Sequence, residues 1–248
     1  MAEEGVKVLV RAVVAAAFDT NCYVVAPGRG EQCVVVDPGI GVVRALESVL
    51  RAEQLHPAAV LLTHGHVDHC FSVAPVCGAR GITAYVHPAD RAMVADPTKW
   101  ISAGLLSMLG RLLPYSEPDD VAPLPDAGTI EVAGIEITVD LAPGHTGGSV
   151  LFRLAGAASG LDAPVVPERL RGGDELCLSG DVLFAGSIGR TDLPGGSLHE
   201  MARSLRDKIL PLDDATVVLP GHGSATTIGR ERRTNPYLLE VAETGELG

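Results

Sequence analysis

Three histidines and one aspartate lie within the seven residues 63–69, as His64, His66, Asp68 and His69. They directly follow the apolar run 58–62, which is typical of a short buried strand. Histidine is the most frequent side-chain metal ligand, and carboxylates complete sites for zinc or iron. Because a buried polar group without a partner costs about 1–3 kcal/mol, a metal ion is the simplest partner for all four side chains. The segment therefore predicts a metal site at the end of a strand.

The spacing within this segment favours two metal ions over one. The His-x-His pair can aim His64 and His66 at one point, whereas Asp68 and His69 follow at the next turn and face another direction. Four ligands from so short a segment are more easily divided between two ions than arranged tetrahedrally around one. A centre with two ions needs further ligands from elsewhere in the chain, including one that can bridge.

Three further residues stand in similar settings: His145, Asp181 and His222. Each follows a segment that is typical of a strand, and each lies beside glycine, which lets the backbone come close to a ligand. Sites in open α/β sheets usually lie at the carboxyl ends of strands. A single histidine in a turn would be weak evidence, but the same setting at four places predicts one shared metal centre.

The elements that must position these side chains form two runs of strands. The first run is expected near 6–14, 21–26, 32–37, 58–63 and 82–86, and the second near 129–132, 135–141, 149–154, 175–180 and 216–219. Helices are expected over 41–54, after His69, in a broken form over 88–113, and near 197–209. The proline-rich stretch 114–125 is expected to link the two halves, and one further helix near 230–243 to follow His222.

In this order, the histidines and aspartates resemble the metallo-β-lactamase superfamily, and within it the glyoxalase II-like hydrolases, also called hydroxyacylglutathione hydrolases. The resemblance extends over about residues 21–237 and includes the segments VDPG (36–39), SGDVLF (179–184), GRTDLPGG (189–196) and LPGHG (219–223). It implies an α/β fold, the αββα four-layer sandwich, in which two mixed β-sheets carry helices on their outer faces. The expected organisation is a single domain over 1–248, with a surface insertion at 155–174 and no separate C-terminal helical domain.

The resemblance also assigns metal ligands in two groups joined by a bridge: His64, His66 and His145; Asp68, His69 and His222; and Asp181 between them. Two divalent ions, zinc or alternatively iron or manganese, would depress the pKa of a water molecule. The metal-bound hydroxide would then attack an acyl carbonyl. Asp68 is the expected catalytic residue, because it could orient this nucleophile while also binding metal.

The activity that this resemblance implies is hydrolysis of a thioester, of the S-lactoylglutathione type or another conjugate of a low-molecular-weight thiol. One alternative is a persulfide dioxygenase, which shares the fold but uses a single iron held by two histidines and one aspartate. A lactonase, which would hydrolyse cyclic esters without a thiol carrier, is another. A binding scaffold without metal is the non-enzyme alternative. The thiol carrier, the acyl group and the oligomeric state cannot be read from the residues.

Three residues near these motifs have two interpretations each. Asp37 either orients a metal ligand or ends its strand in an Asx-turn before Pro38. Arg190 either binds a substrate carboxylate or, as we prefer, holds Asp192 within its loop. Trp100, in the segment 93–115 with Lys99, Met108 and Tyr115, would suit an acyl or thiol tail, although core packing is the simpler explanation.

Composition favours a cytoplasmic enzyme, and the resemblance implies a small-molecule thioester as its partner. The 31 acidic residues outnumber the 19 basic ones and give a net charge of −12, which argues against nucleic acid as a partner, although some nucleases share the metal motif. Five cysteines without a Cys-x-x-Cys pair favour reduced thiols, and Cys70 is interpreted as a small core residue. No membrane span is expected, and the apolar segment 8–18 is predicted as a strand rather than a signal peptide.

Overall fold

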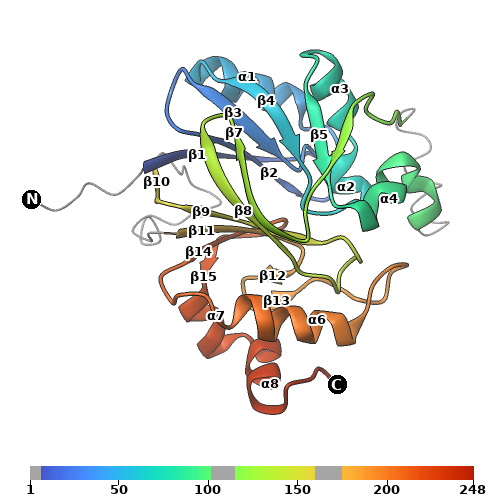
Figure 1. Cartoon of the computed structure of the whole chain (residues 1–248), viewed down its shortest axis with the longest axis vertical. Helices are drawn as coiled ribbons and strands as arrows, with labels where there is room; N and C mark the ends of the chain where they lie inside the picture. Colours follow the sequence, from blue (N-terminus) through green and yellow to red (C-terminus); the bar gives the residue numbers. More distant parts are fainter. Residues whose placement is uncertain (1–6, 102–114, 160–174) are drawn as a thin grey trace, which may run out of the picture.

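The computed structural model describes residues 7–101, 115–159 and 175–248. Two β-sheets pack face to face, and helices cover their outer faces (Figure 1). The first sheet contains, in spatial order, β10 (Ala157–Ser159), β1 (Lys7–Val14), β2 (Asn21–Ala26), β3 (Gln32–Val36), β4 (His56–Leu61), β5 (Thr83–Val86) and β6 (Val121–Pro123). The second contains β15 (Thr226–Thr227), β14 (Val217–Pro220), β11 (Glu175–Gly180), β9 (Val150–Ala155), β8 (Ile135–Leu141) and β7 (Ala127–Val132). Both sheets combine parallel and antiparallel pairs, so the predicted αββα sandwich is confirmed.

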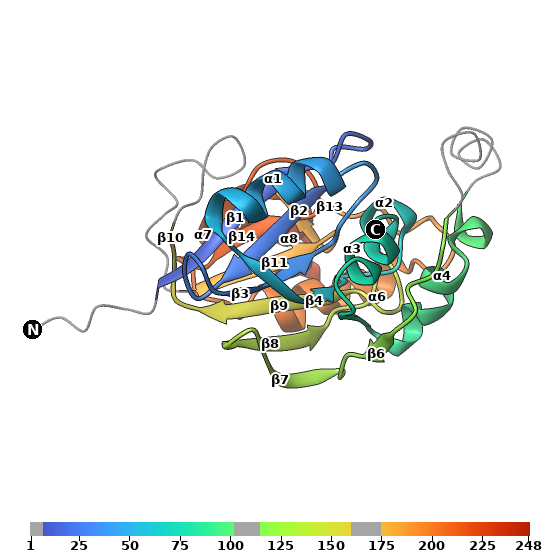
Figure 2. The ribbon, with the colours of Figure 1, turned by 90° about the horizontal axis from the view of Figure 1, so that it is seen from above.

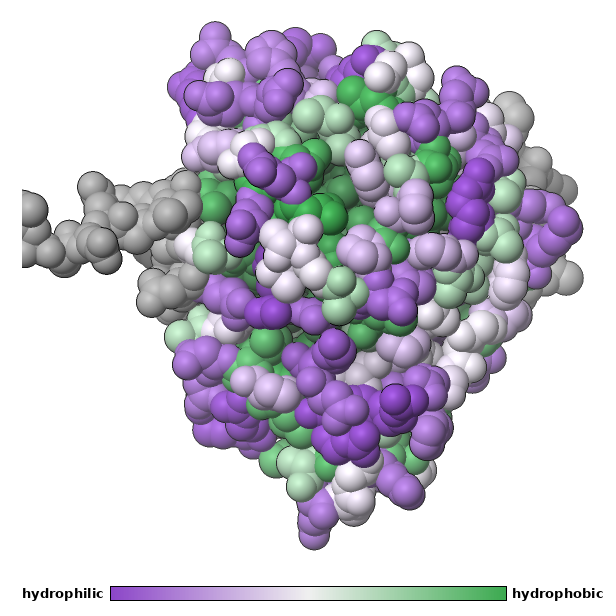
Figure 3. All heavy atoms as spheres, in the orientation of Figure 1, coloured by the Kyte–Doolittle hydropathy of each residue, from purple (hydrophilic) through white to green (hydrophobic). Residues whose placement is uncertain are grey.

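The helices divide between the two outer faces. The helices that follow strands of the first sheet are α1 (Val43–Glu53), α2 (Val67–Cys70), α3 (Val73–Gly78) and α4 (Arg91–Ala95), with two 3₁₀ turns, η1 (Pro88–Asp90) and η2 (Pro97–Trp100). The second sheet is covered by α6 (Leu198–Ser204), which continues as a π-helical turn, η4 (Leu205–Ile209), and by α7 (Ile228–Thr234) and α8 (Pro236–Thr244). A small hairpin, β12 (Leu183–Phe184) and β13 (Ser187–Ile188), lies outside both sheets. In Figure 2, α1 lies across the strands of the first sheet, and in Figure 3 hydrophilic residues gather over the outer helices.

Strands of the first sheet are buried on both faces, so successive side chains alternate between two cores. Val34 and Val36 of β3 face the second sheet, whereas Cys33 and Val35 pack under the helices. A strand buried on both faces has a continuous apolar sequence, as strands covered by helices usually do. On α1, Leu46 and Leu50 lie one turn apart and are buried against the same layer.

The structure differs from the sequence expectations where short elements depend on pairing. The predicted linker 114–125 contains β6, which extends the first sheet by pairing in parallel with β5. The predicted insertion 155–174 begins with β10, which crosses to the first sheet and pairs in parallel with β1, while 160–174 lie outside the described residues. Two helices, not one, follow His222, because Pro236 starts a new helix that is capped by the Asn235 side chain. Among the described residues, no helix has the length and apolar character needed to span a membrane.

The packing between the two sheets gives the first testable prediction. Phe152 of β9 lies between the sheets and is 0% exposed. Phe152→Ala removes the ring and leaves a cavity, so we expect the free energy of unfolding to fall by about 3–5 kcal/mol, as measured by urea denaturation. Phe152→Leu keeps most of the volume and should cost clearly less. Equal losses in the two variants would contradict close packing at this position.

Candidate metal centre

The structure brings together all seven residues that the sequence analysis proposed as ligands. His64, His66, Asp68 and His69 follow β4, Asp181 follows β11, His222 follows β14, and His145 lies in the loop between β8 and β9. Three groups have candidate donor atoms that lie within 4.8 Å of one another: His64, His66 and His145; Asp68, His69 and His222; and Asp37, His64 and His69. The first two groups are those that the resemblance implied. The third contains Asp37, whose contacts with its neighbours explain its role.

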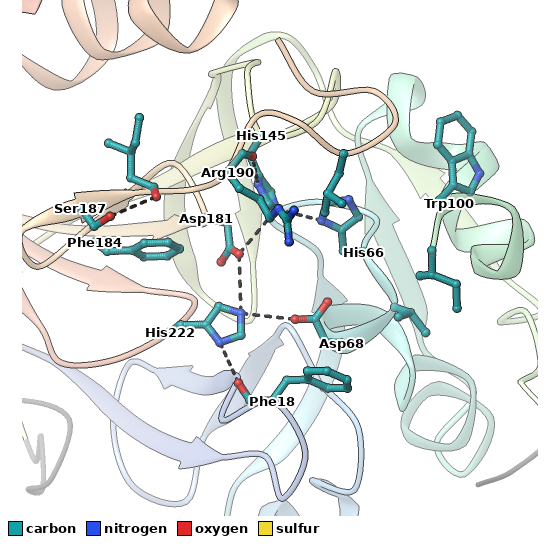
Figure 4. A pocket seen from close by; sticks show the side chains of 14 residues that line it. Phe18, His66, Asp68, Trp100, His145, Asp181, Phe184, Ser187, Arg190 and His222 are labelled. Carbon is teal, nitrogen blue, oxygen red and sulfur yellow. Dashed lines mark hydrogen bonds and ion pairs between the residues drawn. The ribbon is translucent and has the colours of Figure 1, made fainter. Parts of the chain in front are cut away.

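Asp181 lies between the first two groups. Its Oδ1 is 3.4 Å from His69 Nε2, and its Oδ2 is 3.5 Å from His145 Nε2 and 3.6 Å from His222 Nε2. Figure 4 shows the carboxylate between His145 and His222, and Asp68 approaches the same ring nitrogen of His222, while the Phe18 carbonyl lies at the other nitrogen. One carboxylate therefore faces imidazoles of both groups, which is the position that a bridging ligand requires.

Hydrogen bonds fix which ring nitrogen carries the proton in three of the histidines. His69 Nδ1 donates to Asp37 Oδ2 at 2.9 Å, His145 Nδ1 donates to the Arg190 carbonyl at 2.8 Å, and His222 Nδ1 donates to the Phe18 carbonyl at 3.0 Å. Because carbonyl and carboxylate oxygens only accept here, each Nδ1 must hold the proton. In the neutral ring, Nε2 then carries the lone pair, which is the state that a metal ligand needs, and in His145 this atom lies 2.8 Å from His66 Nδ1.

Asp37 extends the same control to His64 through Thr63. Asp37 Oδ1 accepts from the Thr63 backbone N–H at 2.8 Å, and Asp37 Oδ2 accepts from the Thr63 hydroxyl at 2.6 Å. Since the hydroxyl proton is used, His64 Nδ1 is the donor in its 3.0 Å contact with Thr63 Oγ1. His64 Nε2 is thereby left with its lone pair. Of the two interpretations of Asp37, the structure supports orientation of metal ligands.

Three buried atoms at the centre have no hydrogen-bond partner among the described residues: His64 Nε2, His66 Nε2 and Asp181 Oδ1. Native proteins rarely leave such atoms unpaired, because desolvation then goes uncompensated. In the second group, the three donor atoms are separated by 3.2, 3.3 and 3.7 Å. A tetrahedral ion with bonds of about 2.1 Å would place its ligand atoms about 3.4 Å apart. The residues present therefore fit a divalent metal ion.

The electrostatic field differs between the two groups. Burial lowers the pKa of His64 and His66, and the neighbouring imidazoles lower it further, to about 4 for His66. Burial also disfavours charge on His69, but Asp181, Asp68 and Asp37 outweigh it and raise the pKa of His69. Although burial opposes ionisation of Asp68, the nearby His69 and His222 hold its pKa well below the usual range. The second group thus stabilises positive charge, while His64 and His66 of the first group are neutral imidazoles at neutral pH.

Two residues that the sequence analysis did not single out hold the ligand loops together. The Asn21 side chain donates to the carbonyls of Pro220 and Gly223 at 2.9 and 2.8 Å, on either side of His222. Asp90 accepts hydrogen bonds from Gly65, Thr146 and Gly148 at 2.6 to 2.8 Å. It therefore ties the loop of His64 and His66 to the loop of His145. Neither residue is part of a sequence motif, because its hydrogen-bond partners are distant in the sequence.

A cleft of about 610 Å³ opens over the centre. Its walls are mainly apolar and are formed by Phe18, Val67, Trp100, Ile101, Phe184, Ile188 and Leu193, while His66, Asp68, His145, Asp181 and His222 are also exposed to it. Trp100 therefore lines the cleft, which supports a substrate-facing position over packing in the core. Met108 lies outside the described residues, and the hydroxyl of the half-buried Tyr115 donates to the Val94 carbonyl.

The contacts of Arg190 and Cys70 agree with the interpretations that the sequence analysis preferred. The Arg190 guanidinium donates through Nε and Nη2 to the two carboxylate oxygens of Asp192, both at 2.7 Å, as the preferred interpretation predicted. Arg190 also stands at the cleft, and its carbonyl orients His145, a role that no side-chain pattern could reveal. Cys70 is buried in the layer between the first sheet and its helices, and burial raises the pKa of its thiol to about 12. It is a core residue, as predicted.

Comparisons with known proteins agree with the fold and with this centre. The family model of the metallo-β-lactamase superfamily matches residues 15–158 and 168–222, and the chain belongs to this superfamily. An uncharacterized protein of Mycobacterium tuberculosis, Rv2581c, is 45% identical over 88% of this chain and 92% of its own. The hydroxyacylglutathione hydrolase GloC of Haemophilus influenzae is 29% identical over 90% of this chain and 94% of its own.

Two solved structures have the same fold over almost the whole chain. The crystal structure of BLEG-1, a B3 metallo-β-lactamase, has a TM-score of 0.75 and 34% identity, and the match covers 93% of this chain and 99% of that one. The structure of TTHA1623 in a di-iron-bound form has a TM-score of 0.71 and 34% identity, with coverage of 92% and 99%. Together with the grouped imidazoles and carboxylates, these relationships define a metallohydrolase superfamily fold with a centre suited to divalent metal ions.

The Asp37 contacts generate a prediction about metal affinity. Asp37 has a positive φ of 51°, which asparagine tolerates, so Asp37→Asn should leave the backbone in place. An amide offers one acceptor oxygen instead of two, so at least one of the three hydrogen bonds from Thr63 and His69 is lost. We expect metal affinity to fall by about 10–100-fold, measured by competition with a colorimetric chelator. Glu136→Gln on the exposed side of β8 is the control, and unchanged affinity in Asp37→Asn would refute the orienting role.

Gly221 gives a second prediction, because the centre leaves no room for a side chain there. A Cβ atom at Gly221 would collide with Asp181 Oδ1 and His69 Cε1. Gly221→Ala should therefore displace ligands of both groups and reduce bound metal, as measured by elemental analysis of the purified protein. Gly28→Ala is a matched control, because nothing lies within 4 Å of the added methyl group. Full metal content in Gly221→Ala would show that the centre is looser than the structure indicates.

Proposed function

We propose that this protein is a dinuclear metal-dependent hydrolase that cleaves a thioester, of the S-lactoylglutathione type or another conjugate of a low-molecular-weight thiol. The observation that carries the proposal is the position of Asp181, whose two carboxylate oxygens face imidazoles of two separate ligand groups. One ion would be held by His64, His66 and His145, the other by Asp68, His69 and His222, and Asp181 would bind both. Zinc is our proposal for the metal, with iron and manganese as alternatives that the same ligands accept.

When bound, two divalent ions supply Lewis-acid polarisation of the acyl carbonyl and lower the pKa of a water molecule at the centre. The protein residues orient the attacking water and the metal ligands. Asp68 is partly exposed to the cleft and stays ionised, because His69 and His222 depress its pKa against the effect of burial. Its carboxylate can therefore accept a hydrogen bond from an attacking water and orient it. Asp37 and the backbone carbonyls of Phe18 and Arg190 keep the histidine rings in one tautomer throughout.

The cleft supports an acyl group with an apolar part. Phe18, Phe184 and Trp100 are spread around the centre rather than stacked on one side (Figure 4). Apolar walls with a few polar groups at the base are typical of small-molecule sites, and they exclude bulk water from the reaction. Arg190, at the cleft, is the position where a carboxylate of the thiol carrier could compete with Asp192 for the guanidinium.

The similarity to the Haemophilus influenzae hydroxyacylglutathione hydrolase supports this substrate class, although similarity to BLEG-1 makes a β-lactam the necessary comparison. We propose a small molecule as the only substrate partner, with no role for nucleic acid or membrane. The five cysteines are all unpaired thiols and all buried, which supports a reducing compartment, and we propose the cytoplasm.

The test of the reaction compares substrates on the same metal-loaded protein. We expect turnover of S-lactoylglutathione, followed by loss of thioester absorbance, to exceed hydrolysis of a lactone and of a chromogenic β-lactam. Oxygen consumption with glutathione persulfide should be absent. Preference for the lactone or the β-lactam would replace the thioester in the proposal, and oxygen uptake would favour the dioxygenase alternative.

Removal of the bridging carboxylate should separate the two metal sites. Asp181→Ala leaves the two histidine groups without the residue that joins them, so at least one metal ion per chain should be lost. We expect kcat to fall by about 10³-fold or more, because metal activation and charge stabilisation are lost together. Asp213→Ala, on an exposed turn, is the control. Near-normal turnover with full metal content in Asp181→Ala would refute the bridging role.

A further inference from the structure

The buried glutamate Glu231 lies outside the metal centre and has no part in the chemistry described above. It belongs to the first turn of α7 and is 0% exposed. Its Oε1 accepts from the Thr226 hydroxyl at 2.5 Å, and its Oε2 accepts from the Gly186 backbone N–H at 2.7 Å and from Asn235 Nδ2 at 3.0 Å. A buried carboxylate is costly unless several donors compensate for lost water, so this arrangement is expected to serve a specific purpose.

The contact with Gly186 connects Glu231 to the wall of the cleft. Gly186 is in the turn of the β12–β13 hairpin and has a positive φ of 78°. The hairpin residues Phe184, Ser187 and Ile188 all line the cleft, and Phe184 lies within 6.1 Å of His222 between ring centroids. The hairpin belongs to neither large sheet, so its two strands pair with each other, and Leu183 together with such side-chain contacts joins it to the rest of the fold.

Asn235 completes the attachment from the next helix. Its Oδ1 caps α8 by accepting from the Tyr237 N–H at 3.1 Å, while its Nδ2 donates to Glu231 and to the Ser187 carbonyl, the latter at 3.1 Å. Asn235 is also 0% exposed. The two residues thus form a buried staple, defined here as Glu231 and Asn235, that joins α7 and α8 to both strands of the hairpin.

The turn that carries Asp181 has hydrogen bonds that do not involve Glu231 or Asn235. It is closed by the Val182 N–H, which donates to the Ser179 carbonyl at 3.0 Å, and by the Ser179 hydroxyl, which donates to the Leu183 carbonyl at 2.8 Å. Within the described part of the chain, Glu231 forms no hydrogen bond or ion pair with any of the seven ligand residues. Loosening the staple should therefore move the cleft wall and leave the metal ligands in place.

We propose that Glu231 is a positioning residue for substrate recognition, which sets the β12–β13 hairpin and hence the Phe184 side of the cleft from within the C-terminal helices. This inference rests on the proposed function in that the wall is taken to contact the acyl group or the thiol carrier. The C-terminal helices then influence the substrate through one buried carboxylate, without contacting it themselves.

The first test needs no substrate. Glu231→Gln leaves one acceptor oxygen where the carboxylate has two, so the side chain can no longer accept from Thr226 at one end and from Gly186 and Asn235 at the other. Hydrogen–deuterium exchange of the metal-loaded full chain should become faster in the hairpin segment 183–188, while the segment 175–180 of β11 keeps its protection. Glu243→Gln on the exposed side of α8 is the same substitution away from the hairpin and should leave exchange unchanged. Unchanged exchange at 183–188 in Glu231→Gln would overturn the proposal.

The second test measures the effect on the substrate. In Glu231→Gln, KM for the thioester should rise by roughly fivefold while kcat changes by less than about twofold, because a wall contact and not the chemistry is weakened. In a Phe184→Ala background, Glu231→Gln should have little further effect on KM, since the side chain that it positions is gone. Additive effects, or a fall in kcat with loss of metal, would show that Glu231 acts elsewhere.

A second variant covers the case in which Glu231→Gln does not fold, and the exchange experiment does not depend on the proposed activity. Should Glu231→Gln fail to fold, Asn235→Ser retains a cap for α8 but is too short to reach Ser187, and it should give the same faster exchange at 183–188. Exchange at the wild-type rate in Asn235→Ser would overturn the proposal. If the wild-type protein does not hydrolyse thioesters at all, the proposed function fails, while the exchange experiment still decides whether Glu231 positions the hairpin.

Discussion

The hydrogen bonds of one buried carboxylate, Asp37, determine the state of the metal centre. Asp37 ends β3 and reaches Thr63 and His69 beyond β4, because the two strands are parallel neighbours whose carboxyl ends meet at the same edge. It fixes the protons on His69 directly and on His64 through Thr63. Its positive φ shows that the backbone adopts a conformation disfavoured for this residue, which persists only where surrounding contacts require it.

The centre also depends on how the two sheets are packed. The first sheet supplies the ligands of residues 64–69, while the second supplies Asp181, His222 and the loop of His145. Asn21 and Tyr23 of β2 both donate to the Pro220 carbonyl, so the strand that contributes to the core between the sheets also holds the turn of His222. Formation of the metal site is therefore a consequence of sheet packing, and both groups require the complete sandwich.

Much of this structure could be predicted because its signals are local. The segment 63–69 carries four ligands within seven residues, and strands such as β3 are almost entirely apolar, so both the ligands and the strands can be recognised in the sequence. The stabilising contacts are not local: Asp90 and Glu231 act on loops far away in the chain, and the acceptors for His145 and His222 are backbone carbonyls. Short strands such as β10 exist only through pairing with distant partners, which no local periodicity can indicate.

The central claim is that two ligand groups, joined by Asp181, hold two divalent ions. Anomalous X-ray diffraction from crystals of protein purified without chelator, recorded on both sides of the absorption edge of the bound metal, tests it most directly. The account predicts two anomalous peaks on either side of the Asp181 carboxylate, about 3.5–4 Å apart. A single peak within one histidine group, with Asp181 bound on one side only, would contradict it.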